Sequence, residues 1–389
     1  MNSGWFLTYL HDIVVTVLVL TVQCAGALLL LRHPAVRSSR RLKTAIYAAT
    51  PVSCFIVIFA ALLRFARVNR HFSVLFANRT HAAGMGWGLL SVFLVAMLAL
   101  AKLLPRAEDV HNPARRKFLR LVRAVGVGAP AIALGYGTFI ERSNLRLREE
   151  SISIPDLHPD LDGLRLVQLS DIHLSPFLSE KELNRAIAMA NETKAHIALV
   201  TGDLISLRGD PLDLCLDRLA GLRAEAGIFG CLGNHEIYAD VEDYAADRGA
   251  QLGIRFLRAA AEPLKFGGAM LNLAGVDYQR MHSAYLRGAE KMIRPAALNI
   301  LLSHNPDVFP VAARQGWQVT IAGHTHGGQI NVEILGKDLN MARFFTPYTM
   351  GLYRIGASSI YVSRGIGTIG LPVRLGVAPE VALLRLCRT

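Results

Sequence analysis

Cysteine is scarce in this 389-residue chain, which has five cysteines, and none is paired at a spacing that holds zinc. An odd number of widely separated cysteines also excludes a disulfide framework. Cys24 and Cys54 lie inside apolar runs, where a cysteine behaves as a small buried hydrophobe. The cysteines therefore indicate no functional site.

Acidic residues are few in the amino-terminal part of the chain. Residues 1–150 have 19 Lys and Arg against 6 Asp and Glu, whereas residues 151–389 have 23 against 24. The formal net charge of +12 therefore belongs to the first part. A nucleic-acid-binding protein needs a basic face on a folded domain. Here the basic residues lie between apolar runs, where they set membrane orientation, so we expect no nucleic-acid partner.

Charged residues are also absent from the interiors of four long apolar stretches, at 13–31, 45–63, 82–101 and 122–140. About twenty apolar residues cross the ~30 Å hydrocarbon core of a bilayer as a helix. Buried helices of a soluble domain seldom stay uncharged over this length. We therefore predict a transmembrane region over 1–141 with about four spans. The lack of charge inside the spans argues against a transporter or channel, which would need polar groups along its path.

The basic residues between these stretches predict their orientation. The first and third loops hold twelve Lys and Arg, and the second loop holds four. The positive-inside rule places the first and third loops in the cytoplasm. Four spans then place the residues after 141 on the extracytoplasmic side of the plasma (inner) membrane. Arg115-Arg116-Lys117 resembles a twin-arginine export signal; the alternative is a basic flank before an uncleaved anchor, and both interpretations direct the next domain outward.

The remaining chain has an α/β pattern. A linker and first strand are expected over 142–162, followed by a domain over 163–389. Apolar runs of five to eight residues alternate there with amphipathic helical stretches. Five of these runs end in polar clusters, and an α/β sheet places its ligand-binding loops at strand ends. The clusters therefore predict one converging site.

The polar clusters contain the residue types that hold metal ions. Asp171 and His173 are two residues apart, so both side chains can lie on one face. Asp203 follows Gly202, which lets the backbone turn sharply. The further candidates are Asn234, His235, His304, His324 and His326. A single one of these is more often a structural residue, but their joint occurrence after five apolar runs indicates a metal centre.

The order of these clusters resembles the calcineurin-like metallophosphoesterase superfamily over about 163–389. The segments 363–367 and 371–374 are similar to its bacterial membrane-associated branch of YkuE-like or YaeI-like phosphodiesterases. The resemblance implies a β-sandwich flanked by helices. It also implies one metal on Asp171, His173, Asp203 and His326, and a second on Asp203, Asn234, His304 and His324. Asp203 would bridge both metals, while His235, beside Asn234, would face the scissile phosphate and protonate the leaving oxygen.

Two metal ions suit this ligand set chemically. A pair of ions ~3.5–4 Å apart clamps a phosphoryl group and lowers the pKa of a bridging water, so that a hydroxide attacks phosphorus. Mixed nitrogen and oxygen ligands favour manganese, iron or zinc over magnesium or calcium. We therefore expect two divalent or trivalent ions of this group as cofactors.

The expected function is hydrolysis of phosphomonoesters or phosphodiesters. Membrane tethering favours a membrane- or envelope-associated substrate, such as a lipid-linked phosphate, with membrane lipid as a partner. One alternative is a lipid A precursor hydrolase that resembles UDP-2,3-diacylglucosamine pyrophosphatase. An alternative of another class is a catalytically silent membrane scaffold. The natural substrate, the metal identity and the oligomeric state stay open at this point.

Overall fold

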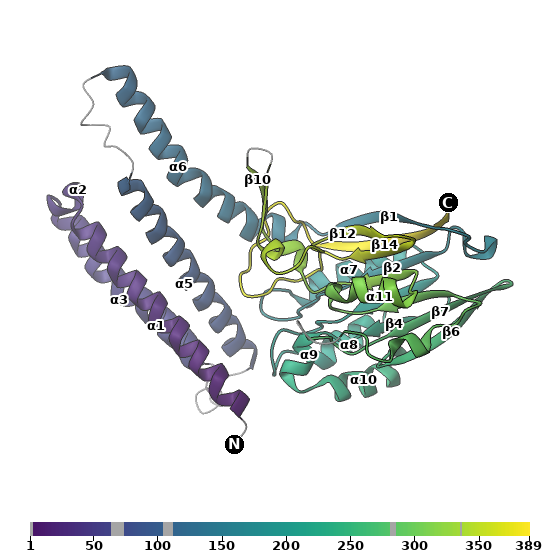
Figure 1. Cartoon of the computed structure of the whole chain (residues 1–389). Helices are drawn as coiled ribbons and strands as arrows, with labels where there is room; N and C mark the ends of the chain where they lie inside the picture. The colour runs from purple at the N-terminus through teal and green to yellow at the C-terminus, as the bar shows by residue number, and fades with distance from the viewer. Residues whose placement is uncertain (1–2, 64–73, 104–111, 281–284, 335–336) are drawn as a thin grey trace. The chain divides into compact units, whose positions relative to one another are not determined.

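The computed structural model describes residues 3–63, 74–103, 112–280, 285–334 and 337–389. It divides the chain into two compact units, Met1–Gly135 and Tyr136–Thr389 (Figure 1). The boundary lies inside one helix, six residues before the expected end of the membrane region at residue 141. Each unit is described separately below.

The first unit is helical. Its helices are α1 (Ser3–Leu31), α2 (Pro34–Arg37), α3 (Arg40–Leu62), α5 (Val74–Leu103) and the greater part of α6 (Pro113–Phe139). Small residues allow close helix packing, because a Cβ atom on Gly84 would lie 2.1 Å from that of Ala60. Gln23 donates a hydrogen bond to Ser91, and Trp87 donates one to Ser53. Polar groups on neighbouring helices are thus paired with one another.

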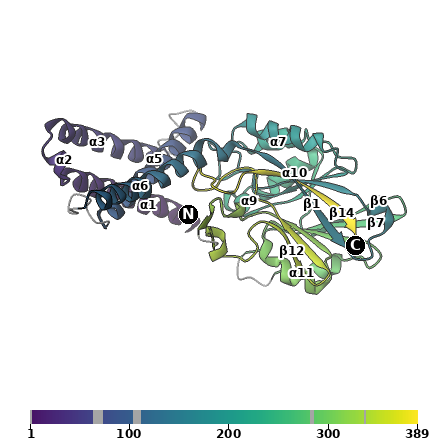
Figure 2. The same cartoon turned by 90° about the horizontal axis from the view of Figure 1, so that it is seen from above.

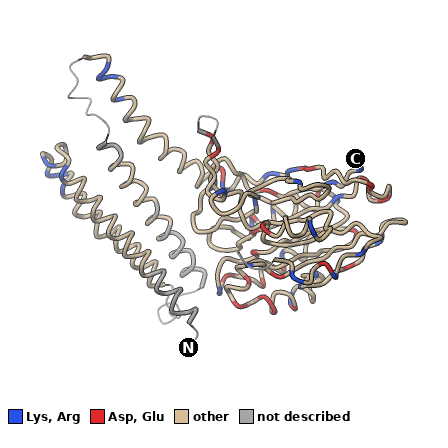
Figure 3. The backbone as a smooth tube through the Cα atoms, viewed as in Figure 1, with Lys and Arg blue, Asp and Glu red and all other residues tan. Residues whose placement is uncertain are grey.

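Three segments are long and apolar enough to cross a membrane: Ile13–Leu31, Arg40–Leu62 and Pro113–Ser143. They match three of the four expected spans. The expected span at 82–101 lies within α5, but among the described residues its apolar part is only the shorter stretch Gly86–Met97. The unit therefore contains candidate membrane-spanning helices, while the number four remains a prediction. Figure 3 shows Lys and Arg positions gathered near the amino-terminal end of α6, and both basic and acidic positions along the backbone of the second unit.

The second unit contains two six-stranded sheets. The first has the order β1-β14-β2-β3-β4-β5, in which the neighbours β2, β3, β4 and β5 run parallel. Its strands are β1 (Arg146–Ile154), β2 (Arg165–Leu169), β3 (Ile197–Thr201), β4 (Ile228–Cys231), β5 (Ile254–Phe256) and β14 (Glu380–Arg388). Strand β14 pairs parallel with β1 and antiparallel with β2, so the last strand closes the sheet between the first two.

The second sheet has the order β12-β13-β9-β8-β7-β6, with β13, β9, β8 and β7 parallel. Its strands are β6 (Ala260–Phe266), β7 (Ala269–Gly275), β8 (Leu298–Leu302), β9 (Val319–Ala322), β12 (Gly351–Ile355) and β13 (Ser358–Val362). A separate hairpin is formed by β10 (Asn331–Ile334) and β11 (Lys337–Asn340). The apolar runs expected to be strands include β2, β3, β4, β8 and β9, so that part of the α/β prediction is confirmed.

Alternating side chains join the two sheets into a sandwich. Leu166 of β2 and Leu199 of β3 share one buried cluster with Leu271 of β7 and Ile300 of β8. Their neighbours on the same strands, such as Val167, point to a second cluster on the outer side. Successive residues of a strand face opposite sides. The core between the sheets is therefore built from every second residue of the central strands.

Helices cover the outer faces of both sheets (Figure 2). The first sheet packs against α7 (Glu180–Glu192), α8 (Leu212–Leu219) and α10 (Glu242–Gln251), and the second against α11 (Phe309–Gln315). Helix α7 begins with a capping box, in which Ser179 and Glu182 each accept a hydrogen bond from the other's backbone N–H. A short helix, α9 (Asn234–Ala239), begins directly after β4. These layers leave the carboxyl ends of the parallel strands free to carry loops.

Candidate metal centre

The predicted ligands all follow the carboxyl ends of parallel strands. Asp171 and His173 follow β2, Asp203 follows β3, and Asn234 and His235 begin α9 after β4. The ligands from the other sheet are His304 after β8 and His324 and His326 after β9. Parallel strands bring their carboxyl ends to one edge, so both sheets deliver polar side chains to the same place.

One group of potential ligands comprises Asp171, His173, Asp203 and His326, whose ligand atoms all lie within 4.8 Å of one another. The Nε2 atom of His326 is 3.5 Å from Oδ1 of Asp171, and the Nε2 atom of His173 is 3.5 Å from Oδ2 of Asp203. All four residues are buried. Two carboxylates and two imidazoles in this arrangement offer a mixed oxygen and nitrogen site.

A second group comprises Asp203, His304 and His324, also within 4.8 Å of one another. The Nε2 atom of His304 lies 3.1 Å from Oδ2 of Asp203. Asn234 begins the adjacent helix, and its side-chain oxygen is buried without a hydrogen-bond partner among the described residues. Asp203 therefore belongs to both groups, as a bridging carboxylate would.

The residues present fit metal ions chemically. The Nε2 atoms of His173 and His326 face each other at 3.1 Å. Two neutral imidazoles make such a contact only through a proton on one of them, whereas both can bind one ion through their lone pairs. Buried polar atoms normally have partners, yet Nε2 of His304 and Oδ1 of Asn234 have no hydrogen bond among the described residues. Unpartnered acceptors at this point are what a metal site requires.

The charges of the metal-free cluster are strongly coupled. Burial alone would lower the pKa of His304, but the neighbouring Asp203 carboxylate raises it to about 10. Burial would raise the pKa of Asp203, but His304 and His173 hold it well below its ordinary value. Burial lowers the pKa of His324 to about 3, and that of His326 well below its usual range. Both of these imidazoles are therefore neutral, which is the form that binds metal.

Backbone strain concentrates at the same residues. Eleven non-glycine residues in the described part of the chain have positive φ, and five of them are predicted ligands. These five are Asp171, His173, Asp203, His324 and His326, with φ between 46° and 77°. Non-glycine residues adopt this conformation rarely, and it is enriched at functional sites. The fold holds these side chains in conformations that local preference disfavours.

Two glycines allow the strand ends to meet. A Cβ atom on Gly323 would lie 2.0 Å from Oγ of Ser170 and 2.3 Å from Oδ2 of Asp171. Gly202 has φ of +85°, and its Cβ would lie 2.6 Å from the backbone nitrogen of Gly233. Side chains at either position would separate the ligand loops. Both residues are therefore needed for close approach of backbone to ligand.

Comparison with known proteins agrees with this geometry. Residues 164–328 match the family model described as calcineurin-like phosphoesterase. The chain contains a calcineurin-like metallophosphoesterase domain. Domains of this family use divalent metal ions, and the chain is accordingly a phosphoric ester hydrolase.

Bacterial relatives cover the metallophosphoesterase domain and part of the preceding region. The uncharacterized metallophosphoesterase YkuE of Bacillus subtilis is 28% identical over 282 residues, which are 71% of this chain and 98% of the relative. The phosphodiesterase YaeI of Escherichia coli is 27% identical over 285 residues, 70% of this chain and 98% of the relative. The expected similarity to these proteins is confirmed.

A vertebrate relative also combines the two kinds of region. The transmembrane protein with metallophosphoesterase domain of Danio rerio is 28% identical over 297 residues, which are 72% of this chain. This chain covers 66% of that relative. Membrane helices and a metallophosphoesterase domain thus occur together in a similar protein.

Several residues hold the ligands in place. His304 donates from Nδ1 to the carbonyl of Thr201, and Nδ1 of His173 lies 3.1 Å from Oγ of Ser206. These contacts leave Nε2 of each ring for a metal and fix the ring orientation. The fully buried Glu236 accepts hydrogen bonds from the backbone N–H groups of Asp203, Leu204 and Gly233. Sequence reasoning missed Glu236, although its place three residues after Gly233 is a helix-capping position.

His235 lies beside the metal ligands without belonging to either group of ligands. Its Nδ1 donates to the carbonyl of Ser206 at 2.6 Å, and its backbone N–H donates to Oδ1 of Asp203 at 2.9 Å. Its ring packs edge-on against His173, with 4.8 Å between ring centroids. Burial lowers the pKa of His235, although the neighbouring Asp203 carboxylate acts to raise it. The Nε2 atom is thus the position at which this ring can bind or release a proton.

The segment 363–374 supports the centre from the carboxyl-terminal side. Ile366 and Gly367 donate backbone hydrogen bonds to the carbonyls of Ser170 and Asp171. Arg374 is fully buried and donates to the carbonyls of Gly365 and Gly367. This arginine therefore fixes the loop that contacts the first metal ligand. The sequence had indicated segments 363–367 and 371–374, but not the hydrogen bonds from Arg374 to Gly365 and Gly367.

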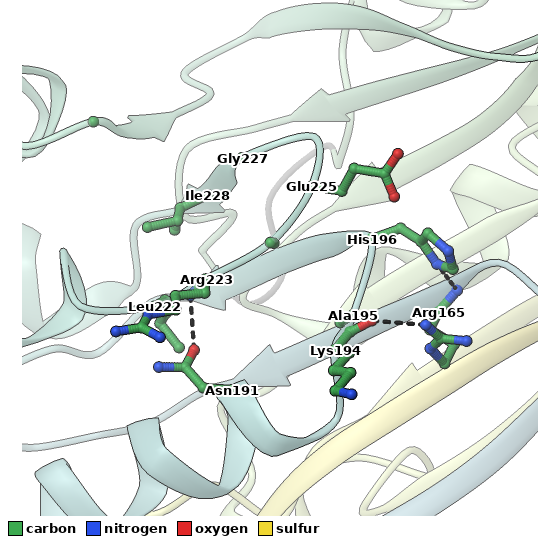
Figure 4. A pocket seen from close by; sticks show the side chains of 12 residues that line it. Arg165, Asn191, Lys194, Ala195, His196, Leu222, Arg223, Glu225, Gly227 and Ile228 are labelled. Atoms are coloured by element: carbon green, nitrogen blue, oxygen red, sulfur yellow. Dashed lines mark hydrogen bonds between the residues drawn. The ribbon is translucent and has the colours of Figure 1, made fainter.

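A cavity lies at the other end of the same strands (Figure 4). It has a volume of about 770 Å³ and is lined by residues at or just before the starts of β2, β3, β4 and β5. Arg165 donates to the carbonyl of Lys194, and the backbone of Arg223 donates to Asn191. The predicted ligands are not among its lining residues. The cavity is consequently separate from the metal centre.

Proposed function

We propose that the domain hydrolyses phosphomonoesters or phosphodiesters at a centre of two metal ions, on a membrane- or envelope-associated substrate. Asp171, His173, Asp203 and His326 would hold one ion, and Asp203, Asn234, His304 and His324 the other. The observation that supports this most is the membership of Asp203 in both ligand groups. A shared carboxylate offsets the repulsion between two ions. Manganese, iron and zinc all suit these ligands.

Bound ions would supply electrostatic stabilisation of the phosphoryl group and lower the pKa of water. His235 would act as the general acid. Its Nδ1 is committed to the carbonyl of Ser206, so Nε2 is the atom that can give a proton to the leaving oxygen. The Asp203 carboxylate accepts the backbone N–H of His235, which fixes this residue relative to the shared ligand.

The test uses the full chain in detergent, stripped by a chelator and reloaded separately with manganese, iron or zinc. Substrates are 4-nitrophenyl phosphate, a monoester, and methyl 4-nitrophenyl phosphate, a diester. We expect at least one metal to restore nitrophenol release from at least one ester, with about two ions per chain. A protein that takes up metal but releases no nitrophenol under any of these conditions would contradict the proposal and favour the silent scaffold.

We further propose that the domain lies on the extracytoplasmic side of the plasma (inner) membrane. The support is the basic excess in the first and third expected loops, with twelve residues against four. Alkaline phosphatase fused after Thr389 should be active, and green fluorescent protein fused there should be dark. The reverse result would place the domain in the cytoplasm. It would then favour the alternative of a lipid A precursor hydrolase resembling UDP-2,3-diacylglucosamine pyrophosphatase.

A further inference from the structure

Large apolar side chains are exposed in two short segments of the second unit. Twelve large hydrophobic residues are exposed among the described residues of this unit, and six of them lie in these segments. Four are in the segment 339–345, called here the apolar loop: Leu339, Met341, Phe344 and Phe345, which are 56%, 57%, 79% and 70% exposed. The other two are Phe139 and Ile140 at the end of α6, 80% and 57% exposed. Single exposed hydrophobics are ordinary, but a cluster marks an interaction surface.

The apolar loop is an ordered part of the fold. Its residues Met341–Phe344 form a short 3₁₀ turn that begins at Asn340, whose side chain accepts a hydrogen bond from Ala342. The backbone N–H groups of Phe345 and Thr346 donate to the carbonyl of Ala342. The side chain of Thr346 in turn donates to Asp307. The backbone therefore holds the two phenylalanines out of the core, although burying them would be favourable.

The apolar loop is attached directly to the metal centre. Asn340 is buried, and its side chain donates to the carbonyl of Gly327 at 2.8 Å. Gly327 follows the predicted ligand His326 in the chain. On the other side of the loop, the carbonyl of Thr349 accepts a hydrogen bond from Thr325. The exposed apolar side chains therefore lie beside the loop that carries two ligands.

The same part of the unit holds the end of the membrane helix. The backbone N–H of Arg374 donates to the carbonyl of Gly137 in the last turn of α6. The next residue, Leu375, accepts from Asn331 and donates to Gln329, which are at the base of the β10–β11 hairpin (Figure 1). Gly137 permits this approach, because a Cβ atom there would lie 2.7 Å from the carbonyl oxygen of Arg374. One chain of hydrogen bonds thus joins the end of α6 to the hairpin that leads into the apolar loop.

The apolar segment that could span a membrane ends at this end of α6. The helix belongs to the apolar segment Pro113–Ser143, long enough to cross a membrane, and its apolar run ends at Ile140, before Glu141 and Arg142. Aromatic side chains are favoured at the boundary between water and lipid. Arg343 lies between Ala342 and Phe344 and pairs with Asp338; a cation at this position suits lipid phosphates.

We propose that the apolar loop inserts into the lipid interface of the membrane that α6 spans, so that the metal centre works on phosphoesters carried by lipids. This inference rests on the proposed phosphoesterase function. The lipid tails would stay in the bilayer beside Phe344 and Phe345, while the phosphate reaches the ligands that follow β9. A protein partner on the same surface is the alternative that the experiments below would detect.

The first experiment compares two diesters with the same reacting bond, hexadecyl 4-nitrophenyl phosphate in vesicles and soluble methyl 4-nitrophenyl phosphate. The variant Met341→Ser/Phe344→Ser/Phe345→Ser should lose about tenfold or more in kcat/KM on the hexadecyl ester and stay within about twofold on the methyl ester. The control Leu147→Ser/Ile355→Ser removes exposed apolar side chains elsewhere and should change neither. Equal loss on both esters, or no loss on either, would overturn the inference.

The wild-type protein separates the two proposals. Failure to hydrolyse 4-nitrophenyl phosphate and both of these diesters under every metal condition would refute the proposed function itself. Hydrolysis of the methyl ester with no loss in the variant on the hexadecyl ester would refute only the lipid-surface inference. The control variant shows whether exposed apolar residues in general affect the assay.

The second experiment measures insertion directly and does not depend on activity. An environment-sensitive fluorophore is attached to Phe344→Cys or to Ile355→Cys in the full chain, and the native cysteines contribute the same background to both. Both labelled proteins are placed in nanodiscs of phosphatidylethanolamine and phosphatidylglycerol. The fluorescence emission of the label at position 344 should be shifted to the blue relative to that of the label at position 355, which should remain exposed to buffer. A shift seen in native membranes but not in these nanodiscs would assign the surface to a protein partner and overturn the proposal.

Discussion

The two ends of strands β2, β3 and β4 differ in chemistry although the same strands connect them. At the carboxyl ends, carboxylates and imidazoles are buried, and Nε2 of His304 and Oδ1 of Asn234 have no hydrogen-bond partner among the described residues. At the amino ends lies a cavity of about 770 Å³ whose lining includes Arg165, Lys194 and Arg223. Basic side chains repel metal ions, whereas carboxylates attract them. The comparison teaches that donor chemistry, and not cavity size, identifies the metal centre.

We expect the largest difference in metal content and kcat/KM between Asp203→Asn, at the carboxyl ends of the strands, and Arg165→Gln, at their amino ends. Asp203 contacts both ligand groups, so its loss should remove both metals and lower kcat/KM by about 10³-fold or more. Arg165→Gln breaks a hydrogen bond to the carbonyl of Lys194 and should leave kcat/KM within about twofold. Metal analysis and nitrophenyl ester kinetics measure both. Full metal content and activity in Asp203→Asn would remove the bridging role.

His235→Asn should separate catalysis from metal binding at the carboxyl ends. We expect normal metal content and a loss of about 10²–10⁴-fold in kcat on alkyl phosphoesters, whose leaving groups need a proton. Nitrophenyl esters should be affected less, because their leaving group is stable as an anion. An equal loss on both kinds of ester would leave only electrostatic stabilisation for His235.

Glu236→Gln tests how far the carboxyl-end geometry depends on residues that bind no metal. Glu236 accepts three backbone N–H groups, and one amide oxygen cannot replace two carboxylate oxygens. We expect metal affinity to fall by about 10–100-fold and unfolding free energy to fall by about 1–3 kcal/mol. Metal titration and thermal unfolding measure these effects. Unchanged metal affinity in a stably folded variant would make Glu236 dispensable for the site.

The smallest effect that we expect is the release of a proton when metal binds at the carboxyl ends of the strands. Asp203 raises the pKa of His304 to about 10 in the metal-free protein, so His304 is protonated at neutral pH. A metal must displace that proton. Metal affinity should therefore rise with pH, by about tenfold per unit for one proton, and level off above the pKa of His304. Calorimetry of metal binding in buffers of different ionisation enthalpy should show that the buffer takes up a proton. The control Arg165→Gln should behave like the wild type. A metal affinity that does not depend on pH would contradict the assignment of this proton to His304.

Much of the site follows from local sequence. Each ligand is next to an apolar run that forms a parallel strand, and strand ends are visible as a switch from apolar to polar residues. Asp171 and His173 are paired by spacing alone, and so are His324 and His326. The apolar stretches at 13–31, 45–63 and 122–140 are likewise local signals, because helix length and hydropathy decide whether a segment can span a bilayer.

Other features appear only when distant segments meet. Positive φ at five ligands depends on contacts that outweigh local preference, and no pattern within each motif encodes it. Glu236 acquires its role because β3 and α9 lie together. The backbone of Arg374 is hydrogen-bonded to Gly137 at the end of α6, more than 200 positions earlier. Phe344 and Phe345 are ordinary core residues by type, and only the fold leaves them exposed beside a metal ligand. The sequence by itself was enough to predict the metal ligands and the apolar helices, because both predictions depend on residue type and spacing within short windows. The tertiary structure decided which surfaces surround the ligands, because packing between distant segments settles what is buried and what is left in contact with water or lipid.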